Sequence, residues 1–198
     1  TDNPFKIKDN IDMELLIQSI VDNGVLIPIV VNKVNDKYEV ISGERRIYAC
    51  KKAGIETIPA LIKNMNRDEA VIFLVDSNLH REGLLPSEKA FAYKMRLEAM
   101  KHQGRTSPQV GQKLTSVQEI ANSSSDSKTQ IQRYIRLTYL QKPLLDMVDN
   151  GRIALTPAVE LSYLTKQEQL TLIDTIETLD CTPSLSQAIR MKKLSKDG

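Results

Sequence analysis

Strand-like segments are confined to the first third of this 198-residue chain. Apolar runs of strand length occur at residues 25–31, 38–41 and 58–62. From Pro86 onward, no segment has the alternating or continuous apolar pattern of a strand. This asymmetry predicts an α+β chain, with a small mixed α/β domain over residues 1–85 and an all-helical domain over residues 86–198. Pro28 predicts that the first strand either lies at a sheet edge or begins near the proline.

Helical spacing of apolar residues fills most of the remaining chain. The expected helices cover residues 12–23, 47–53, 67–79, 86–102, 116–123, 127–140, 143–149, 156–164, 166–179 and 184–194. Three of them have start signals with capping-box spacing, at Ser116 with Glu119, Ser127 with Gln130, and Thr165 with Glu168. Thr156-Pro157 is interpreted as an N-cap followed by proline, and Asn150-Gly151 as a helix stop. The composition of residues 105–114 predicts a loop.

The net charge of +2 is unevenly distributed. Residues 101–152 contain eight Lys and Arg against four Asp and Glu, so a nucleic-acid surface is expected in the middle of the chain. The two cysteines and two histidines have no metal-ligand spacing, which excludes a His-rich metal site and fits a reduced cytoplasmic setting. No apolar run approaches the roughly 20 residues of a membrane helix, so no membrane partner is expected.

The segment Gly43-Glu44-Arg45-Arg46 predicts phosphate binding. It follows a strand-like run and opens a helix-like run, and its glycine permits close approach of the backbone. The free N–H groups and the dipole at a helix N-terminus favour an anion, while two guanidiniums supply charge and forked donors. The alternative interpretation is a helix start whose arginines are solvated.

A second polar group lies at the end of the 67–79 helix. Asn78 and Arg81 are three residues apart, so they share a helix face and could reach the same ligand as Arg45 and Arg46. The alternative is helix capping plus surface charge. Asp76 is a candidate Mg²⁺ ligand because carboxylate oxygens suit this ion.

Residues 116–137 fit a helix-turn-helix. With Ala121 as the small residue of the first helix, the turn falls at Ser125, and Ile131 becomes a buried residue of the second helix. The candidate DNA-contacting residues are Ser127, Lys128, Thr129, Gln130, Gln132, Arg133 and Arg136. Gln and Arg suit base edges, whereas Thr and Lys suit phosphates. Because Ser125 stands where glycine is usual, an ordinary pair of amphipathic helices remains the alternative.

In this order, the three segments resemble the ParB/Spo0J/Noc family of chromosome and plasmid partition proteins. Gly43-Glu44-Arg45-Arg46 matches the family's GERR box, and residues 78–81 resemble its ENLQR box. Asn3-Pro4-Phe5 resembles the family's N-terminal motif, and residues 24–30 resemble the strand that follows it. The helix-turn-helix also falls where the family has one, so the resemblance extends to about Leu164.

This resemblance implies a fold, ligands and partners. Family members have a small ParB/sulfiredoxin-like α/β domain that binds CTP with Mg²⁺, and a helix-turn-helix that binds a centromere-like site in double-stranded DNA. Nucleotide binding closes a homodimer into a sliding clamp, and slow CTP hydrolysis reopens it. By position, the nucleotide would contact Gly43, Glu44, Arg45, Arg46, Asn78 and Arg81. We therefore expect a nucleoid-associated partition protein, with slow CTP hydrolysis as a candidate activity.

Members of the family also bind a ParA-type ATPase through an N-terminal peptide and dimerise through a C-terminal domain. Neither portion is evident in the sequence. Ile27, Asn32 and Ser77 stand where many members have Gln, Arg and Glu, which bears on nucleotide selection and hydrolysis. A ParB-like transcriptional regulator or nucleoid-occlusion protein is the alternative function. A sulfiredoxin-like activity needs a cysteine where this chain has Glu44, and no catalytic set indicates a kinase.

Overall fold

The computed structural model describes residues 3–103 and 116–197 of the chain, so the loop expected at 105–114 lies outside the described residues. The α+β class is confirmed, and the elements occur in the expected order. They are α1 (Ile11–Asn23), β1 (Ile29–Val34), β2 (Lys37–Ser42), α2 (Glu44–Lys52), β3 (Ala60–Lys63), α3 (Arg67–Leu79), α4 (Pro86–His102), α5 (Ser116–Asn122), α6 (Lys128–Leu137), α7 (Lys142–Asp149), α8 (Leu155–Leu161), α9 (Lys166–Leu179) and α10 (Leu185–Asp197).

The three strands form one sheet with the order β2-β1-β3. β1 pairs antiparallel with β2 as a hairpin and parallel with β3. Pro28 immediately precedes β1, because a proline placed before the first ladder residue leaves no sheet hydrogen bond missing. The strand-start interpretation of Pro28 is therefore confirmed, and the edge interpretation is wrong, since β1 is the central strand.

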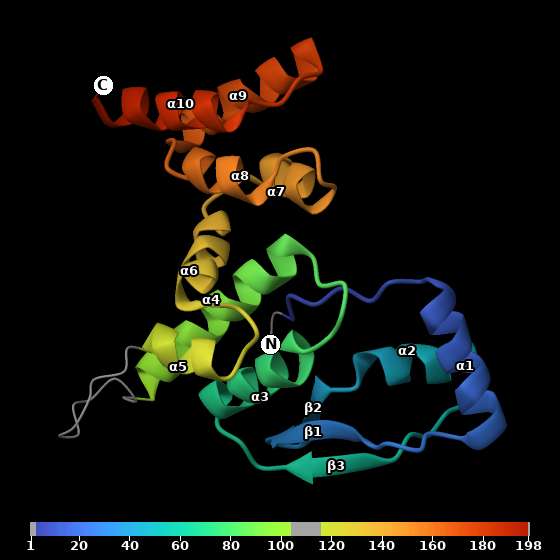
Figure 1. Cartoon of the computed structure of the whole chain (residues 1–198). Helices are drawn as coiled ribbons and strands as arrows, with labels where there is room; N and C mark the ends of the chain where they lie inside the picture. The colour runs from blue at the N-terminus through green and yellow to red at the C-terminus, as the bar shows by residue number, and fades with distance from the viewer. Residues whose placement is uncertain (1–2, 104–115, 198) are drawn as a thin grey trace.

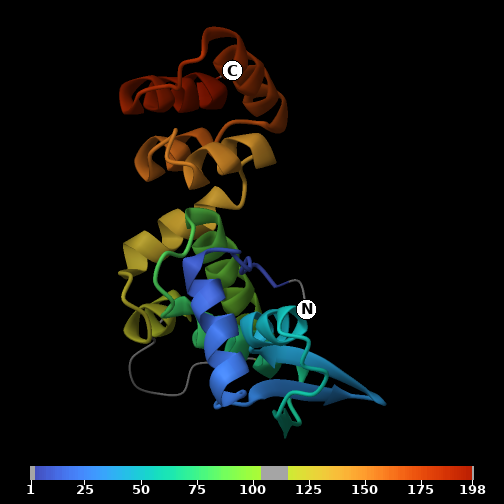
Figure 2. The same cartoon turned by 90° about the vertical axis from the view of Figure 1, so that its right-hand side faces the viewer.

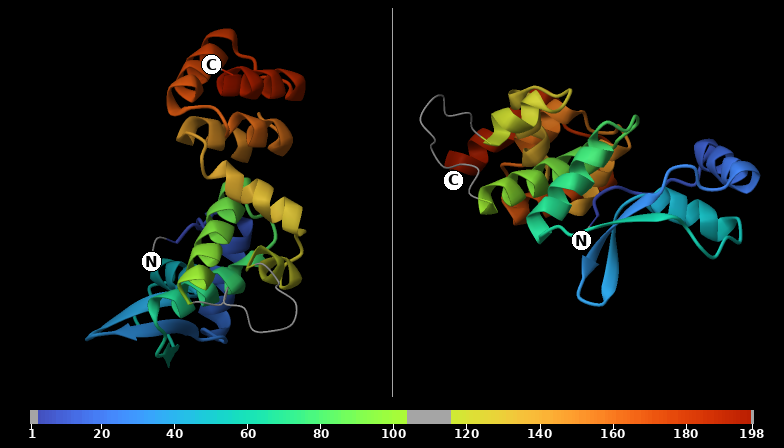
Figure 3. Two further views of the ribbon diagram at one scale, coloured as in Figure 1. Left: turned by 90° about the vertical axis from the view of Figure 1, so that its left-hand side faces the viewer. Right: turned by 90° about the horizontal axis from the view of Figure 1, so that it is seen from below.

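The molecule is extended, with three tiers along its length (Figure 1). The sheet with α1, α2 and α3 forms one end, α4 to α6 form the middle, and α7 to α10 form the other end. Figure 2 shows the same stacking from the side, and Figure 3 shows the β1–β2 hairpin projecting away from the helices. No helix within the described ranges is long and apolar enough to cross a membrane.

α4 contributes side chains to the cores on both of its sides. Ala92 packs in the core of the α/β part with Ile41 of β2, and Ala90 packs in the core of the C-terminal helices. Tyr93 belongs to a third cluster, with the buried Ile131 of α6. The expected boundary between residues 85 and 86 therefore marks the start of a shared helix and not a gap in packing.

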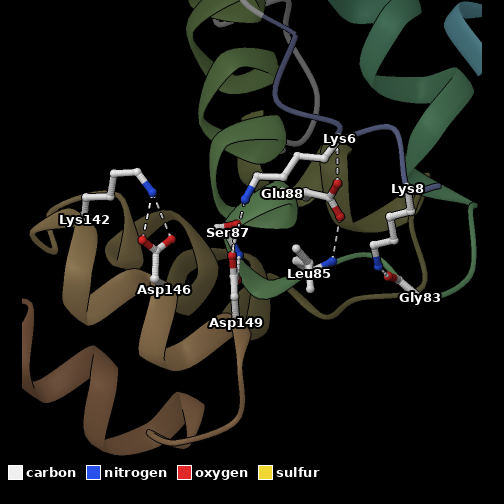
Figure 4. A network of polar contacts seen from close by, with 9 residues as sticks. All are labelled: Lys6, Lys8, Gly83, Leu85, Ser87, Glu88, Lys142, Asp146 and Asp149. Atoms are coloured by element: carbon white, nitrogen blue, oxygen red, sulfur yellow. Dashed lines mark hydrogen bonds and ion pairs between the residues drawn. The ribbon is translucent and has the colours of Figure 1, made fainter. Parts of the chain in front are cut away.

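A buried carboxylate fastens the N-terminal segment to the start of α4 (Figure 4). Glu88 is 1% exposed, and its two oxygens accept hydrogen bonds from the amides of Lys6 and Leu85, each at 2.7 Å. Next to it, the amide of Ser87 donates to Asp149 of α7 at 2.9 Å. This joint connects the beginning of the chain with the middle and C-terminal tiers.

Two of the predicted helix starts are confirmed and one is wrong. Thr165 and Glu168 form a full capping box, and Ser127 caps α6 by accepting from the amide of Gln130 at 3.3 Å. The N-cap of α8 is Ala154 and not Thr156. Thr156 lies in the first turn of α8 instead, where its hydroxyl accepts a hydrogen bond from Arg133. The cap of α5 lies outside the described residues.

Asn32 is a buried structural residue of β1. Its side chain is 2% exposed, and it both donates to the Met65 carbonyl oxygen at 2.9 Å and accepts from the Met65 amide at 2.8 Å. This pair fixes the loop between β3 and α3 to the central strand. We expect Asn32→Ala to lower the free energy of unfolding by about 1–3 kcal/mol, because two backbone groups lose their partner. Chemical denaturation measures this change, and the adjacent exposed Asn64→Ala is the control, expected within about 0.5 kcal/mol.

Candidate functional site

One pocket brings the two predicted phosphate-binding segments together. It has a volume of about 390 Å³ and lies where the N-terminal segment, the start of α2 and the end of α3 meet. All six residues predicted to contact a nucleotide line it, namely Gly43, Glu44, Arg45, Arg46, Asn78 and Arg81. Asn3, Phe5 and Ile7 supply the wall formed by the N-terminal segment. The prediction that the two segments can reach one ligand is therefore supported by their shared pocket.

Gly43 is required by the packing of α2 against β1. Its backbone has φ 110° and ψ 18°, in the left-handed region. A Cβ atom at this position would lie 2.5 Å from Ile29 Cγ2 and 2.9 Å from Ile29 Cβ. No described side chain caps α2, so the amides of Glu44 and Arg45 have no helical acceptor. The glycine therefore brings an open helix N-terminus directly onto the central strand.

The two arginines of this segment have different surroundings. Arg46 Nη1 donates to the carbonyl oxygens of Ile27 and Pro28, at 2.5 and 2.6 Å. Partial burial lowers the pKa of the Arg46 guanidinium from its usual value. The Arg45 side chain forms no hydrogen bond or ion pair with any residue that the structure describes. Arg45 is thus free to meet an anion, whereas Arg46 also holds the segment that leads into β1.

The end of α3 offers one amide oxygen and one guanidinium. Asn78 Nδ2 donates to the Leu74 carbonyl oxygen at 2.9 Å, which leaves Asn78 Oδ1 available. The Arg81 backbone amide donates to the Asn78 carbonyl oxygen at 3.0 Å, while the Arg81 guanidinium has no partner among the described residues. Capping and pocket lining therefore coexist in this segment, although the sequence suggested them as alternatives.

Asp76 does not line this pocket, so its prediction as a metal ligand beside the nucleotide segments is not supported. The side chain pairs with Arg96 of α4 at 3.1 Å and lines a separate depression with Lys63 and Glu69. Two positions along a helix rotate a side chain by about 200°, which separates Asp76 from Asn78. Burial raises the pKa of Asp76, and the charges of Arg96 and His80 act in the opposite direction.

The described residues contain no group of three or more His, Cys, Asp or Glu side chains that could hold a metal ion. The oxygen donors that line the pocket include the Glu44 carboxylate and Asn78 Oδ1. Mg²⁺ commonly takes only one or two protein oxygens and completes its octahedron with phosphate oxygens and water. The donor set therefore fits a magnesium ion that arrives with a phosphate ligand.

The helix-turn-helix frame is present in α5 and α6. Ile120 and Ile131 are fully buried, and Ala121 and Tyr134 are partly buried in the same cluster, as the frame requires. Among the described residues other than glycine, only Asn35 and Asp180 have positive φ, so the turn residue Ser125 does not. This explains why the turn forms without glycine.

α4 supports the turn between α5 and α6 through three polar side chains. Asp126 of the turn accepts from the Tyr93 hydroxyl at 2.7 Å and pairs with Lys89 Nζ at 2.8 Å. Arg96 Nη1 donates to Ser123 Oγ at 2.8 Å. Burial and the hydrogen bond to Asp126 raise the pKa of Tyr93 above its usual range. Sequence reasoning missed these residues, although their spacing of four and three places them on one helix face.

Residues 1–79 match the family of ParB N-terminal domains. The first 79 residues therefore belong to the ParB N-terminal domain family, and the rest of the chain lies outside this match. A nucleoid occlusion protein of Halalkalibacterium halodurans is 36% identical over 76% of this chain and 49% of its own length. A probable chromosome-partitioning protein ParB of Campylobacter jejuni is 30% identical over 88% of this chain and 59% of its own length. The chain thus spans about half the length of the curated relatives it matches.

A crystal structure of C-terminally truncated ParB from Caulobacter crescentus, complexed to the centromeric parS site, has the same fold. The structural match covers 100% of this chain and 93% of the Caulobacter crescentus chain, with a TM-score of 0.54 and 21% sequence identity. The likeness includes the helical part after residue 79, so the fold similarity extends beyond the ParB N-terminal domain itself.

The departures from the family pattern fall in two places in this ParB N-terminal domain. Ile27 is 68% exposed and lines the pocket together with Ser77. Asn32 is buried and bonded to Met65, so it does not reach the pocket. The substitutions at Ile27 and Ser77 therefore change the pocket wall, whereas the substitution at Asn32 belongs to the packing of the sheet.

The predicted DNA-contacting residues of α6 divide by exposure. Those on its open face are Ser127, Lys128, Thr129 and Gln132, whereas Gln130, Arg133 and Arg136 are half-buried. Arg133 Nη2 donates to Thr156 Oγ1 of α8, and Arg136 donates to Ser162 at the end of α8. Arg133 and Arg136 are partly covered because α8 packs beside α6.

Proposed function

We propose that this chain is the nucleotide-binding and DNA-binding portion of a site-specific partition protein. In this proposal, CTP with Mg²⁺ closes a homodimer into a clamp that slides on double-stranded DNA near the nucleoid. The observation that carries the proposal is the pocket in which the start of α2 and the end of α3 meet. The relatives named as chromosome-partitioning proteins support it, since their similarity covers most of this chain.

The triphosphate would be held by groups that differ in what they contribute. Arg45 and Arg81 have free guanidiniums that can neutralise phosphate oxygens. The open amides of Glu44 and Arg45 can donate to the same oxygens, as helix N-termini do for other phosphates. Glu44 and Asn78 would be the protein ligands of Mg²⁺, whose charge would offset part of the phosphate charge.

Nucleotide binding is expected to depend on this pocket and to prefer CTP. Titration calorimetry with CTP, ATP and GTP in the presence of Mg²⁺ should give heat with CTP, and Arg81→Ala should weaken the binding about tenfold to a hundredfold, the range for a lost charged hydrogen bond. Arg67→Ala is a matched control, because Arg67 lies at the opposite end of α3 and outside this pocket. The absence of heat with every triphosphate would remove the proposed nucleotide switch.

Hydrolysis is a separate part of the proposal. Ile27 and Ser77 stand at the pocket wall where many family members carry Gln and Glu, and neither side chain can activate water as a base or hold a metal as a carboxylate does. We therefore propose slow or absent CTP hydrolysis. Phosphate release at a rate typical of the family would contradict this part without touching the binding part.

Specific DNA binding is expected to depend on the two half-buried residues of α6 that can still reach a base edge. Gln130→Ala and Arg133→Ala should each weaken binding to a parS duplex by about 1–3 kcal/mol, the range for a bidentate base contact. Fluorescence anisotropy with parS and scrambled duplexes measures this loss, which should be smaller on the scrambled duplex. If both variants bind parS like the wild-type protein, α6 does not read the site.

A nucleoid-occlusion protein is the second candidate, and the 36% identity to the Halalkalibacterium halodurans protein favours it. Both candidates use the same pocket and the same helix-turn-helix. They differ in their partners, because a partition protein acts with a ParA-type ATPase. Stimulation of a ParA-type ATPase by the complete protein would favour partition, and its absence would favour occlusion or transcriptional regulation.

A further inference from the structure

The last turn of α6 is fastened to the end of α8. Arg136 Nε donates to Ser162 Oγ at 3.0 Å, and Arg136 Nη2 donates to the Ser162 carbonyl oxygen at 2.8 Å. Ser162 is the C-cap of α8 and is only 2% exposed. Helix ends leave backbone carbonyls without an internal donor, and Arg136 supplies a donor at this end of α8.

Two tyrosine rings contact the same guanidinium. The central carbon of the Arg136 guanidinium lies 3.8 Å from the ring centroid of Tyr163 and 4.5 Å from that of Tyr139. Lys192 of α10 lies 3.8 Å from the Tyr163 ring and also pairs with Glu160 of α8 at 2.8 Å. Arg136 is therefore joined to α8 by hydrogen bonds and, through Tyr163 and Lys192, to α10.

A second contact ties α6 to the other end of α8. Arg133 Nη2 donates to Thr156 Oγ1, in the first turn of α8. α8 itself is anchored, because its Ala158 and Leu161 are fully buried in the core of the C-terminal helices. α6 is thus held against α8 near both ends of α8.

Two of the five N–H donors of Arg136, on its Nε–Nη2 edge, are committed to this arrangement. A guanidinium has five N–H groups in a planar fork, and an arginine that reads a base presents two of them to the base edge. In Arg136, Nε and Nη2 are bonded to Ser162 and the ring contacts cover part of the planar group. In helix-turn-helix proteins, base contacts come mainly from the N-terminal residues of the second helix, whereas Arg136 lies in the last turn of α6.

We propose that Arg136 is a positioning residue for DNA binding, which holds α6 at a fixed angle to α8 and α10 and does not itself contact DNA. This inference rests on the proposed function, because it assumes that α6 enters a DNA groove. It assigns the C-terminal helices a part in DNA recognition, since they determine where Lys128, Thr129 and Gln132 are presented.

Five variants separate positioning from contact, and Arg136→Ala among them removes both the charge and the hydrogen bonds. Arg136→Lys keeps the charge but loses the planar fork. Tyr163→Leu removes the ring beneath Arg136, and Tyr163→Phe keeps it. Arg190→Ala removes a positive charge from the exposed face of α10 and serves as the charge control. Affinity for a parS duplex is measured by fluorescence anisotropy over a series of salt concentrations.

We expect Arg136→Lys and Tyr163→Leu to weaken parS binding about tenfold each, with the salt dependence of the wild-type protein, because helix placement and not a phosphate contact is lost. Tyr163→Phe and Arg190→Ala should bind like the wild-type protein. The inference is overturned if Arg136→Lys binds normally while Arg136→Ala reduces the salt slope by about one, which is the signature of a direct phosphate contact.

Amide hydrogen exchange of α6 is a second test of the positioning role, and it needs no DNA. Tyr163→Leu should accelerate exchange in the last turn of α6, and Tyr163→Phe should not. Unchanged exchange in Tyr163→Leu would contradict the positioning role. If the wild-type protein fails to distinguish parS from a scrambled duplex, the proposed function is wrong. The hydrogen-exchange measurement then still shows whether the Arg136–Tyr163 contact fixes the position of α6.

Discussion

Gly43→Ala is expected to lower the free energy of unfolding by about 2–6 kcal/mol and to abolish nucleotide binding. Two costs add at this position. A Cβ atom would approach Ile29 Cγ2 to 2.5 Å, and overpacking of this kind costs about 1–3 kcal/mol. The backbone at φ 110° is also unfavourable for any residue with a side chain, which adds about 1–3 kcal/mol. The change is measured by chemical denaturation and by calorimetric titration with CTP.

Gly54→Ala is the matched control for the clash. Gly54 has φ 71°, but no atom lies within 4 Å of its added Cβ. Its substitution should cost only about 1 kcal/mol and leave nucleotide binding intact. In an Ile29→Ala background, which lacks the Cγ2 atom, Gly43→Ala should cost less than it does in the wild-type protein, although the contact with the Ile29 Cβ atom at 2.9 Å remains. Equal effects of Gly43→Ala and Gly54→Ala would show that the contact with Ile29 is not what requires glycine.

Arg45→Ala and Arg46→Ala are expected to separate ligand binding from stability. Both should weaken CTP binding about tenfold to a hundredfold, since each removes charged hydrogen bonds to phosphate. Only Arg46→Ala should also lower the free energy of unfolding, by about 1–3 kcal/mol, because Arg46 Nη1 bonds the carbonyl oxygens of Ile27 and Pro28. Arg45→Ala should remain within about 0.5 kcal/mol of the wild-type protein.

Arg46→Lys tests the geometry of this second role. Both bonds come from Arg46 Nη1, and a lysine ammonium keeps the charge but lies one bond nearer to Cα, so it does not reach both carbonyls equally well. We therefore expect Arg46→Lys to recover some CTP affinity in calorimetry and little of the lost stability in chemical denaturation. If both arginine-to-alanine variants unfold like the wild-type protein, the bonds from Arg46 to the backbone do not contribute measurably to stability.

Local patterns sufficed for the order and type of the elements. Apolar spacing and capping signals located helices such as α3 and α4 at their observed bounds, because those signals act within a few residues. The central position of β1 was not predictable, since strand order depends on the pairing with β3 at Ala60–Lys63, which is distant in sequence. The proline before β1 constrained where the strand begins but not its neighbours.

The location of the site was predictable where its residues are close together in one sequence motif. Gly43 to Arg46 form a strand–turn–helix unit, so their shared location followed from the sequence. The roles of individual side chains did not follow, because they depend on elements that approach from elsewhere. Gly43 accommodates Ile29, Arg46 holds the chain before β1, and Asp76 turns toward Arg96 of α4. For Arg136, the deciding neighbour is Ser162 of α8, which no local pattern in α6 could reveal.

A single buried cation lies between the pocket end of α3 and the turn of the helix-turn-helix. Arg96 is 7% exposed, and it pairs with Asp76 while donating to Ser123. Asp76 directly precedes Ser77 and Asn78 of the pocket wall. A ligand that draws the end of α3 away from Arg96 therefore also weakens the support of the turn, and DNA that displaces the turn acts on α3 in return. Thermodynamic linkage requires these two effects to be equal in free energy, so Arg96 joins the two sites by a route of three side chains.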